Sequence, residues 1–273
     1  MVVQKPAKIP VVLTVAGFDP SSGAGATADL KTISALGGYG VACLTALTVQ
    51  SSQGVFRVHA IDAEVVRETL ARLVEDMPPA AIKIGMLGSG EVAGAVAEFL
   101  EGWRGVPSVL DPVLRSSSGV DLLDSGGFST VKERILPLVG WAAPNLAEAA
   151  ALSGRPVEAA GDVPAAAAEL QRQFPALNVV VTGGHLGKPD DYFLAPGSPG
   201  VWVEGERVET RSTHGTGCAF STALAVSLAK GTGAEEAVRA AKAYVTGALK
   251  NAPAIGKGRG PLAHFWKLKD SSE

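Results

Sequence analysis

Short, uncharged apolar runs alternate with stretches of helical periodicity along almost the whole chain, and this alternation limits the choice of fold. Residues 41–49 form such a run without one charged side chain. A strand that is buried on both faces of a parallel sheet has this composition, whereas a strand with one solvated face alternates polar and apolar residues. The sequence therefore predicts repeated βα units, an α/β fold of three layers in which helices cover both faces of a mostly parallel sheet.

The expected elements can be placed from periodicity and turn residues. Strands are expected at residues 11–15, 41–49, 81–84, 108–110 and 179–181, and helices at residues 26–35, 63–74, 91–100, 129–136, 146–152, 164–173, 215–230 and 234–250. Residues 192–194, 201–203 and 207–209 alternate and are separated by turns, so they are expected as antiparallel strands at one edge. No shift in composition marks a boundary, and we expect one domain over residues 1–273, with its core at residues 11–265.

Charge and cysteine usage exclude several classes of function. The formal net charge is -3 and no basic stripe occurs, so nucleic acid is not expected as a partner. No apolar run is long enough to span a membrane. The 2 cysteines, Cys43 and Cys218, lie far apart, which excludes a disulfide scaffold and a four-cysteine zinc site. We expect a cytoplasmic protein.

A glycine-rich loop at residues 17–25 follows the first expected strand. Its continuation fits the Gly-x-Gly-x-x-Ala pattern of dinucleotide-binding folds. Such a fold also needs an acidic residue about 20 residues further on to bind the ribose, and no Asp or Glu lies between Leu30 and Ile61. This disfavours nicotinamide binding. Two interpretations of the loop remain: a tight turn between strand and helix, and a loop whose backbone closes on a small ligand.

Two further segments are candidates for chemistry at strand ends. Residues 213–218 read Thr-His-Gly-Thr-Gly-Cys and open a helix of small residues, whose free amides and dipole suit an anion and favour a thiolate at Cys218. In the alternative interpretation, the glycines only allow a tight junction between strand and helix, and Cys218 is a small residue of the core. Asn145 and Glu148 share one face of a helix start. They could orient a hydrated magnesium ion or form a capping box.

Together and in this order, these segments resemble the ribokinase-like superfamily of small-molecule kinases, and within it the hydroxymethylpyrimidine/phosphomethylpyrimidine kinases. The resemblance covers residues 11–265 and is carried by residues 14–25, 28–32, 45–50, 83–87, 111–113, 144–149, 183–186 and 213–218.

The resemblance implies ATP-dependent phosphorylation of 4-amino-5-hydroxymethyl-2-methylpyrimidine and then of its monophosphate, in thiamine biosynthesis. The pyrimidine would bind in one pocket at Gln50, Asp29, Gly17, Met86 and Val113. The anion hole would comprise Gly215, Thr216, Gly217 and Cys218, with Cys218 as the base. ATP phosphates would lie at Asp111, Asn145, Glu148, Thr182 and Gly184. Glu148 would hold Mg²⁺ through water, and the family suggests a homodimer.

Some positions depart from the family pattern. Thr182 stands where the family usually has lysine, and residues 114–119 replace a segment with a second lysine. The rate and the second phosphorylation depend on the positive charge that the two lysines supply in the family, and Arg115 is expected to replace part of it. Two alternatives stay open: a pyridoxal or pyridoxine kinase of the same superfamily, and a non-catalytic pyrimidine sensor that kept the pocket.

Overall fold

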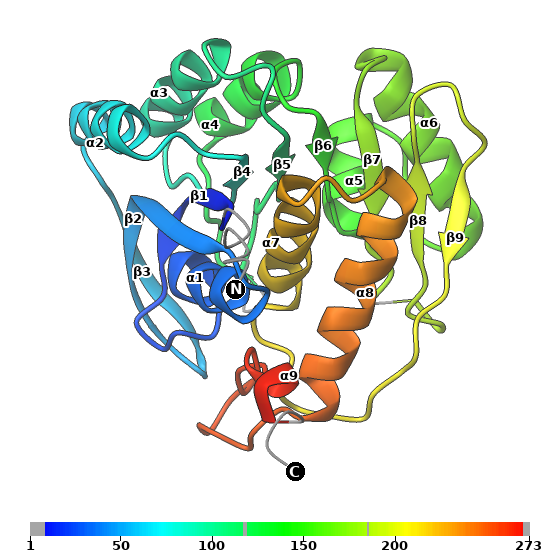
Figure 1. Cartoon of the computed structure of the whole chain (residues 1–273). Coiled ribbons are helices and arrows are strands. Elements are labelled where there is room, and N and C mark those ends of the chain that lie inside the picture. Colours follow the sequence, from blue (N-terminus) through cyan, green and yellow to red (C-terminus); the bar gives the residue numbers. More distant parts are fainter. Residues whose placement is uncertain (1–8, 117–118, 185, 270–273) are drawn as a thin grey trace, which may run out of the picture.

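A single twisted sheet organises the chain, as Figure 1 shows. The computed structural model describes residues 9–116, 119–184 and 186–269. Its 9-stranded sheet has the order β3-β2-β1-β4-β5-β6-β7-β8-β9. The central pairs from β2 to β7 are parallel, whereas β3, β8 and β9 join antiparallel at the two edges. The predicted, mostly parallel sheet is thus confirmed.

The bounds of the elements follow the expected order. The strands are β1 (Val11–Phe18), β2 (Tyr39–Ser51), β3 (Gly54–Ala60), β4 (Ala81–Ile84), β5 (Ser108–Leu110), β6 (Trp141–Ala142), β7 (Asn178–Val181), β8 (Asp191–Leu194) and β9 (Val201–Val203). The helices are α1 (Gly25–Ala35), α2 (Ala63–Asp76), α3 (Gly90–Glu101), α4 (Ser125–Thr130), η1 (Val131–Ile135), α5 (Leu146–Ser153), η2 (Ala160–Asp162), α6 (Val163–Gln173), α7 (Thr216–Ala229), α8 (Ala234–Lys250) and α9 (Trp266–Lys269).

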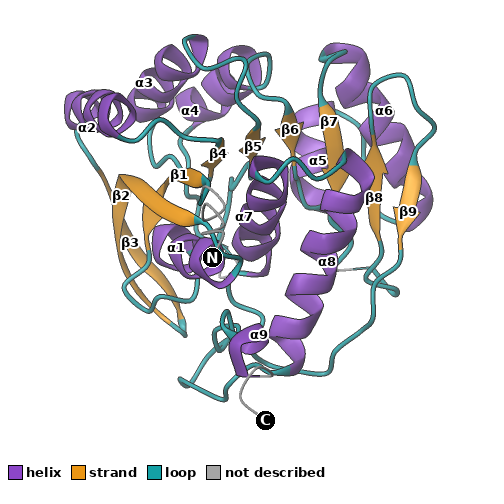
Figure 2. Cartoon of the chain, in the orientation of Figure 1, coloured by secondary structure: helices purple, strands orange, loops and turns teal. Residues whose placement is uncertain are grey.

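Helices cover both faces of the sheet, which makes the three layers visible in Figure 2. On one face α1, α7 and α8 pack on the sheet through a core that includes Leu224. On the other face α2, α3, α5 and α6 bury residues such as Leu70 against the same strands. No helix among the described residues is both long and apolar enough to span a membrane.

Three strands differ from the sequence prediction. The edge strand β3 was not predicted, and it forms an antiparallel hairpin with β2. The short strand β6 was also missed. The strand expected at residues 207–209 is wrong: this segment is a loop in which Arg207 donates to the carbonyl of Leu186 at 2.6 Å. It follows β9 along the carboxyl edge of the sheet instead of extending the sheet.

The parallel register determines where side chains with chemistry gather. Because β1, β2, β4, β5, β6 and β7 run in the same direction, their carboxyl ends lie at one edge. Ligands bind at this edge in open α/β sheets. Gln50 lies near the end of β2, Asp111 follows β5 and Thr182 follows β7. The fold therefore brings most of the predicted residues to the same side of the molecule.

Candidate active site

The two glycine-rich loops pack directly against each other. A Cβ on Gly23 would lie 2.3 Å from Cδ2 of His214, and one on Gly215 would lie 1.9 Å from the carbonyl oxygen of Gly23. Gly215 also has φ +83, which favours glycine. Gly25 has φ +59, and its Cβ would lie 2.3 Å from the oxygen of Gly17. The missing side chains thus make room for protein atoms, which favours the structural interpretation of the first glycine loop over closure on a ligand.

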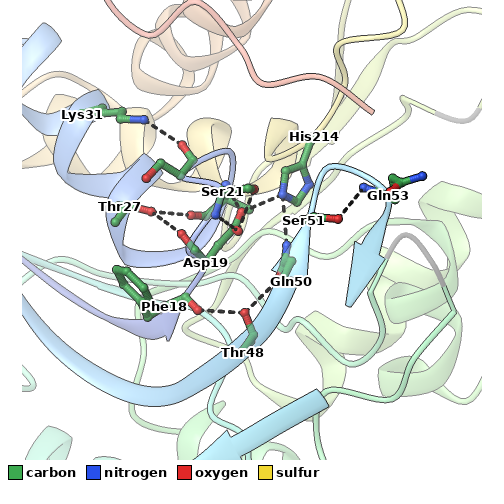
Figure 3. A network of polar contacts seen from close by, with 12 residues as sticks. Phe18, Asp19, Ser21, Thr27, Lys31, Thr48, Gln50, Ser51, Gln53 and His214 are labelled. Atoms are coloured by element: carbon green, nitrogen blue, oxygen red, sulfur yellow. Dashed lines mark hydrogen bonds and ion pairs between the residues drawn. The ribbon is translucent and has the colours of Figure 1, made fainter. Parts of the chain in front are cut away.

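A polar network joins the first loop, β2 and the start of α7, as Figure 3 shows. Nε2 of His214 lies 2.7 Å from Oδ2 of Asp19 and 3.1 Å from Nε2 of Gln50. Asp19 also accepts from the backbone and hydroxyl of Ser21, at 2.8 and 2.7 Å. Burial alone would raise the pKa of Asp19, but the hydrogen bonds from His214 and Ser21 lower it. Asp19 is therefore a carboxylate that fixes His214 beside Gln50.

Sequence reasoning gave Asp19 and His214 no role, although both lie in the motifs. Their spacing of 195 positions along the chain hides the pair. The signal that could have found it is the histidine itself. It stands directly before a glycine-rich helix start, at the edge of the sheet where Asp19 directly follows β1.

A hollow of about 350 Å³ opens beside this network. Its walls are Pro20, Ser21, Gln50, Ser51, Ser52, His214, Ile255, Gly256, Arg259 and Pro261. Gln50 lines it as expected, but the other residues predicted for the pocket do not: Gly17, Asp29, Met86 and Val113. Sequence reasoning did not identify the segment from Ile255 to Pro261 as part of the site.

Gly17, Met86 and Val113 lie together, next to the Gln50 strand. A Cβ on Gly17 would lie 2.9 Å from Sδ of Met86, so the absent side chain gives room to the thioether. Met86 is buried in a small apolar cluster, against which Val113 and Val55 pack. Val55 is the cross-strand partner of Gln50. These residues form an apolar floor, and their contact with a ring stays a prediction.

Asp29 is fully buried and does not line the hollow. Its Oδ2 accepts from Oγ1 of Thr14 at 2.6 Å and from Nζ of Lys83 at 3.0 Å, while its Oδ1 accepts from Oγ1 of Thr222 at 2.7 Å. Both carboxylate oxygens thus have protein partners. The expectation that Asp29 lies in the pocket beside the pyrimidine needs correction, because burial places this side chain behind the site.

Lys83 is the main residue that sequence reasoning missed. It is fully buried, and its Nζ lies 3.0 Å from Asp29 and 3.9 Å from Oδ2 of Asp111. Burial lowers the pKa of Lys83, but the negative charges of the Asp29 and Asp111 carboxylates outweigh it and raise the pKa. A charged residue inside an otherwise apolar strand was the available signal, because a buried charge requires a partner.

Cys218 lies in the first turn of α7, above this charge cluster. Burial raises the pKa of its thiol to about 12; the Lys83 ammonium opposes this rise, and the Asp111 and Asp29 carboxylates add to it. These effects oppose the thiolate that the helix start was expected to favour, and they favour the neutral thiol in the free protein. Asp111 lies close to the same helix start, since a Cβ on Gly217 would be 3.9 Å from its carboxylate oxygens. Cys43 and Cys218 are both free.

Asn145 and Glu148 form a capping box at the start of α5. The backbone of Asn145 donates to Oε2 of Glu148 at 2.9 Å, and the backbone of Glu148 donates to Oδ1 of Asn145 at 3.0 Å. Burial and the nearby Asp111 charge raise the pKa of Glu148 to about 8, against hydrogen bonds that lower it. The structural alternative is thus confirmed, and one further feature remains: two buried carboxyl groups close together, a donor set that suits a hydrated Mg²⁺ with phosphates.

The remaining predicted residues lie at the same edge. The backbone of Thr182 donates to the carbonyl of Pro144 at 2.9 Å, which holds it beside the Asn145 loop. A Cβ on Gly184 would meet nothing within 4 Å, so the loop is open there. Nε of Arg115 lies 2.7 Å from Oδ1 of Asp121 in an exposed ion pair, so its charge is already partnered. Of the motif residues, Ser117, Ser118 and His185 lie outside the described residues.

Comparison with known proteins agrees with this geometry. The family model described as phosphomethylpyrimidine kinase matches residues 19–263. A hydroxymethylpyrimidine/phosphomethylpyrimidine kinase of Streptomyces coelicolor is 43% identical over 263 residues, 96% of this chain and 97% of that protein. A bifunctional thiamine biosynthesis protein of Geobacter sulfurreducens is 40% identical over 95% of this chain, which spans 53% of its length. The ADP complex of Bacillus subtilis pyridoxal kinase superposes with TM-score 0.87 at 32% identity, covering 96% of this chain and 100% of that structure.

Proposed function

Because the chain belongs to the phosphomethylpyrimidine kinase family, we propose that it transfers the γ-phosphoryl group of ATP to 4-amino-5-hydroxymethyl-2-methylpyrimidine and then to the monophosphate, in thiamine biosynthesis. The observation that carries this proposal is that Gln50 and Cys218 lie at the same edge of the sheet. His214, which contacts Gln50, directly precedes the helix start that contains Cys218. Gln50 supplies a donor and an acceptor for the aminopyrimidine edge.

The sheet order separates the two substrates. Gln50 belongs to β2 on one side of the edge, and Asn145 and Thr182 follow β6 and β7 on the other. The start of α7 and Asp111 lie between them. We place the pyrimidine at the β2 side, over the floor of Gly17, Met86 and Val113, and the ATP phosphates at the β5–β7 side near Gly184.

The start of α7 suits phosphoryl transfer. Amides of the first turn have no partner within the helix, and the helix dipole favours the charge on the transferring oxygens. The substrate hydroxyl attacks the γ-phosphorus, the bond to the ADP oxygen breaks, and the hydroxyl proton passes to Cys218. A protonated thiol cannot accept it, so Cys218 must first release its own proton to solvent when the substrates bind. Lys83 is the cation that favours the thiolate, and Asp29 positions Lys83.

Mg²⁺ would be held by Asp111 and Glu148, in part through water. Both carboxyl groups are buried and have raised pKa values, chiefly because of that burial. A divalent cation would offset the cost of burying two negative charges, and it would neutralise charge on the phosphate oxygens. Mg²⁺ commonly binds through one or two carboxylates together with substrate phosphates.

One coupled assay of ADP release tests the function. With ATP and Mg²⁺ present, we expect turnover with the pyrimidine alcohol and with its monophosphate. Pyridoxal is the second candidate acceptor, favoured by the pyridoxal kinase that shares this fold, and a higher kcat/KM for pyridoxal would replace the proposal. Binding of the pyrimidine in calorimetry without ADP release would identify a sensor and contradict it.

We also propose one domain and a homodimer. The continuous sheet supports one domain. The β2–β3 hairpin at its edge exposes Leu47, Val49 and Phe56, with exposed fractions of 44%, 51% and 69%. A second copy of the chain would cover these apolar side chains. Sedimentation equilibrium should give a dimer that Val49→Lys dissociates, and a monomeric wild type would contradict this arrangement.

A further inference from the structure

The contacts around Gln50 are compatible with one arrangement of hydrogen atoms. We propose that His214 and Thr48 hold the Gln50 side-chain amide with its oxygen toward His214 and its NH₂ toward Thr48, and so select which pyrimidine edge the site accepts. The selection rests on the proposed function, because it assumes that Gln50 binds the pyrimidine. The orientation of the amide does not depend on the proposed function.

The first step concerns the contact between His214 and Asp19. The Asp19 side chain is 4% exposed. Its oxygens also accept from Ser21 and, at 2.9 Å, from the backbone of Ala24. An ionised carboxylate can only accept hydrogen bonds. A ring nitrogen 2.7 Å from such an oxygen must therefore carry a hydrogen atom between them. Nε2 of His214 is thus a donor.

The second step concerns the amide group 3.1 Å from the same nitrogen. If NH₂ of Gln50 faced Nε2 of His214, two donors would oppose each other. A half-turn of the amide places the oxygen there instead, and His214 then shares its hydrogen between Asp19 and Gln50. The oxygen and nitrogen of a side-chain amide are distinguished by exactly this kind of partner count, in which each donor must meet an acceptor.

Thr48 provides an independent check of this orientation. Its Oγ1 lies 2.9 Å from the carbonyl oxygen of Phe18 and 3.0 Å from the other terminal atom of the Gln50 amide. A hydroxyl has one hydrogen and cannot donate to two oxygens at once. After the half-turn, Gln50 donates to Thr48 and Thr48 donates to Phe18. Every contact in Figure 3 that involves Gln50 then pairs a donor with an acceptor.

The orientation leaves Gln50 with one free acceptor and one free donor in a fixed order. Its oxygen keeps one lone pair on the His214 side, and its nitrogen keeps one hydrogen on the Thr48 side. A 4-aminopyrimidine offers an amine and a ring nitrogen, which match this order. A 4-oxopyrimidine held with its hydroxymethyl group in the same place offers a carbonyl and a ring N–H, which oppose it. An amide that could turn freely would accept both edges, so the lock creates the selectivity.

Packing and polar contacts hold the His214 ring in place. Gly23 lies against the ring, and any Cβ at that position would collide with Cδ2. Gly23 contacts Cδ2 of the ring, and Asp19 and Gln50 contact the neighbouring Nε2. His214 is therefore a positioning residue, which acts on the substrate through Gln50.

Selectivity kinetics test the lock. We expect wild-type kcat/KM to favour the amino alcohol over its 4-oxo analogue by roughly 10- to 100-fold, since a mismatched edge leaves polar groups unpaired. His214→Phe keeps the ring shape without the N–H, and should reduce this ratio toward one. His214→Gln restores a donor and should recover part of it. His59→Phe, at an exposed histidine of β3, should leave the ratio unchanged. An unchanged ratio in an active His214→Phe enzyme would overturn the selectivity.

Nuclear magnetic resonance of the free wild-type protein tests the orientation without any variant. Nuclear Overhauser contacts from the Gln50 amide protons should reach Thr48, and contacts to the His214 ring protons in their place would overturn the inference. The two proposals fail separately. If the protein does not phosphorylate the pyrimidine, the proposed function is wrong, and the resonance measurement still tests the orientation of the amide. An active kinase without the lock removes only the inference.

Discussion

Replacing Lys83 by methionine removes the cation from a buried cluster while keeping most of the side-chain volume. Nζ of Lys83 lies 3.0 Å from Asp29 and 3.9 Å from Asp111, and none of its side chain is exposed. Without the cation, two carboxylates stay buried with no opposite charge. Removing one partner of a buried ion pair costs roughly 3–5 kcal/mol. The hydroxyls of Thr14 and Thr222 still donate to Asp29, so we expect the lower end of that range.

Urea unfolding at neutral pH measures this loss in the free energy of unfolding. The matched control is Lys250→Met, which breaks an exposed ion pair of 2.6 Å with Glu206 and should cost about 0–1 kcal/mol. Adding Asp29→Asn to Lys83→Met should recover part of the loss, because the amide oxygen still accepts from the hydroxyls without a charge. A loss for Lys83→Met no larger than that of the control would refute the reasoning about the cluster.

Three further predictions follow from single residues. Burial lowers the pKa of His264 from 6.5 to about 4. Between these two pH values the folded protein binds fewer protons than the unfolded one, so it loses stability as the pH falls. His264→Gln should flatten this pH dependence of the free energy of unfolding in urea, and an unchanged dependence would disprove it. Gly23→Ala displaces the His214 ring, so calorimetry should show pyrimidine affinity lowered roughly tenfold or more at unchanged ATP affinity; intact pyrimidine affinity would speak against the packing. Because burial raises the pKa of Cys218 to about 12, the thiolate fraction and kcat/KM should rise between about pH 7 and pH 9; the same rise in Cys218→Asp would mean that another group titrates.

Local pattern was enough to predict the layers and most of the sheet. The uncharged run at residues 41–49 lies within β2, and the loops at strand ends lie at one edge as expected. The edge strand β3 was missed because it is exposed and carries polar side chains. Residues 207–209 alternate like a strand, but Arg207 bonds to the carbonyls of Leu186 and Gly187 and follows the edge. Alternation alone does not determine pairing.

The site was less accessible to sequence reasoning, because its charges pair across long distances in the chain. Asp29 and Lys83 are 54 positions apart, and Asp19 and His214 are 195 apart. Motif resemblance placed Asp29 beside the ligand, whereas burial and three polar partners place it behind the site. The thiol of Cys218 was judged from the helix dipole alone, whereas its burial and the neighbouring carboxylates raise its pKa.

Steady-state kinetics of Cys218→Ala and Gln50→Leu in the same coupled assay test the central claim, that a pyrimidine held at Gln50 receives the phosphoryl group at the start of α7. We predict that Cys218→Ala lowers kcat by roughly 10²–10⁴-fold with little change in the pyrimidine KM. Gln50→Leu should raise the pyrimidine KM by roughly 10- to 100-fold and leave the KM for ATP unchanged. Wild-type kcat in the first variant together with wild-type KM in the second would place the reaction elsewhere and contradict the account.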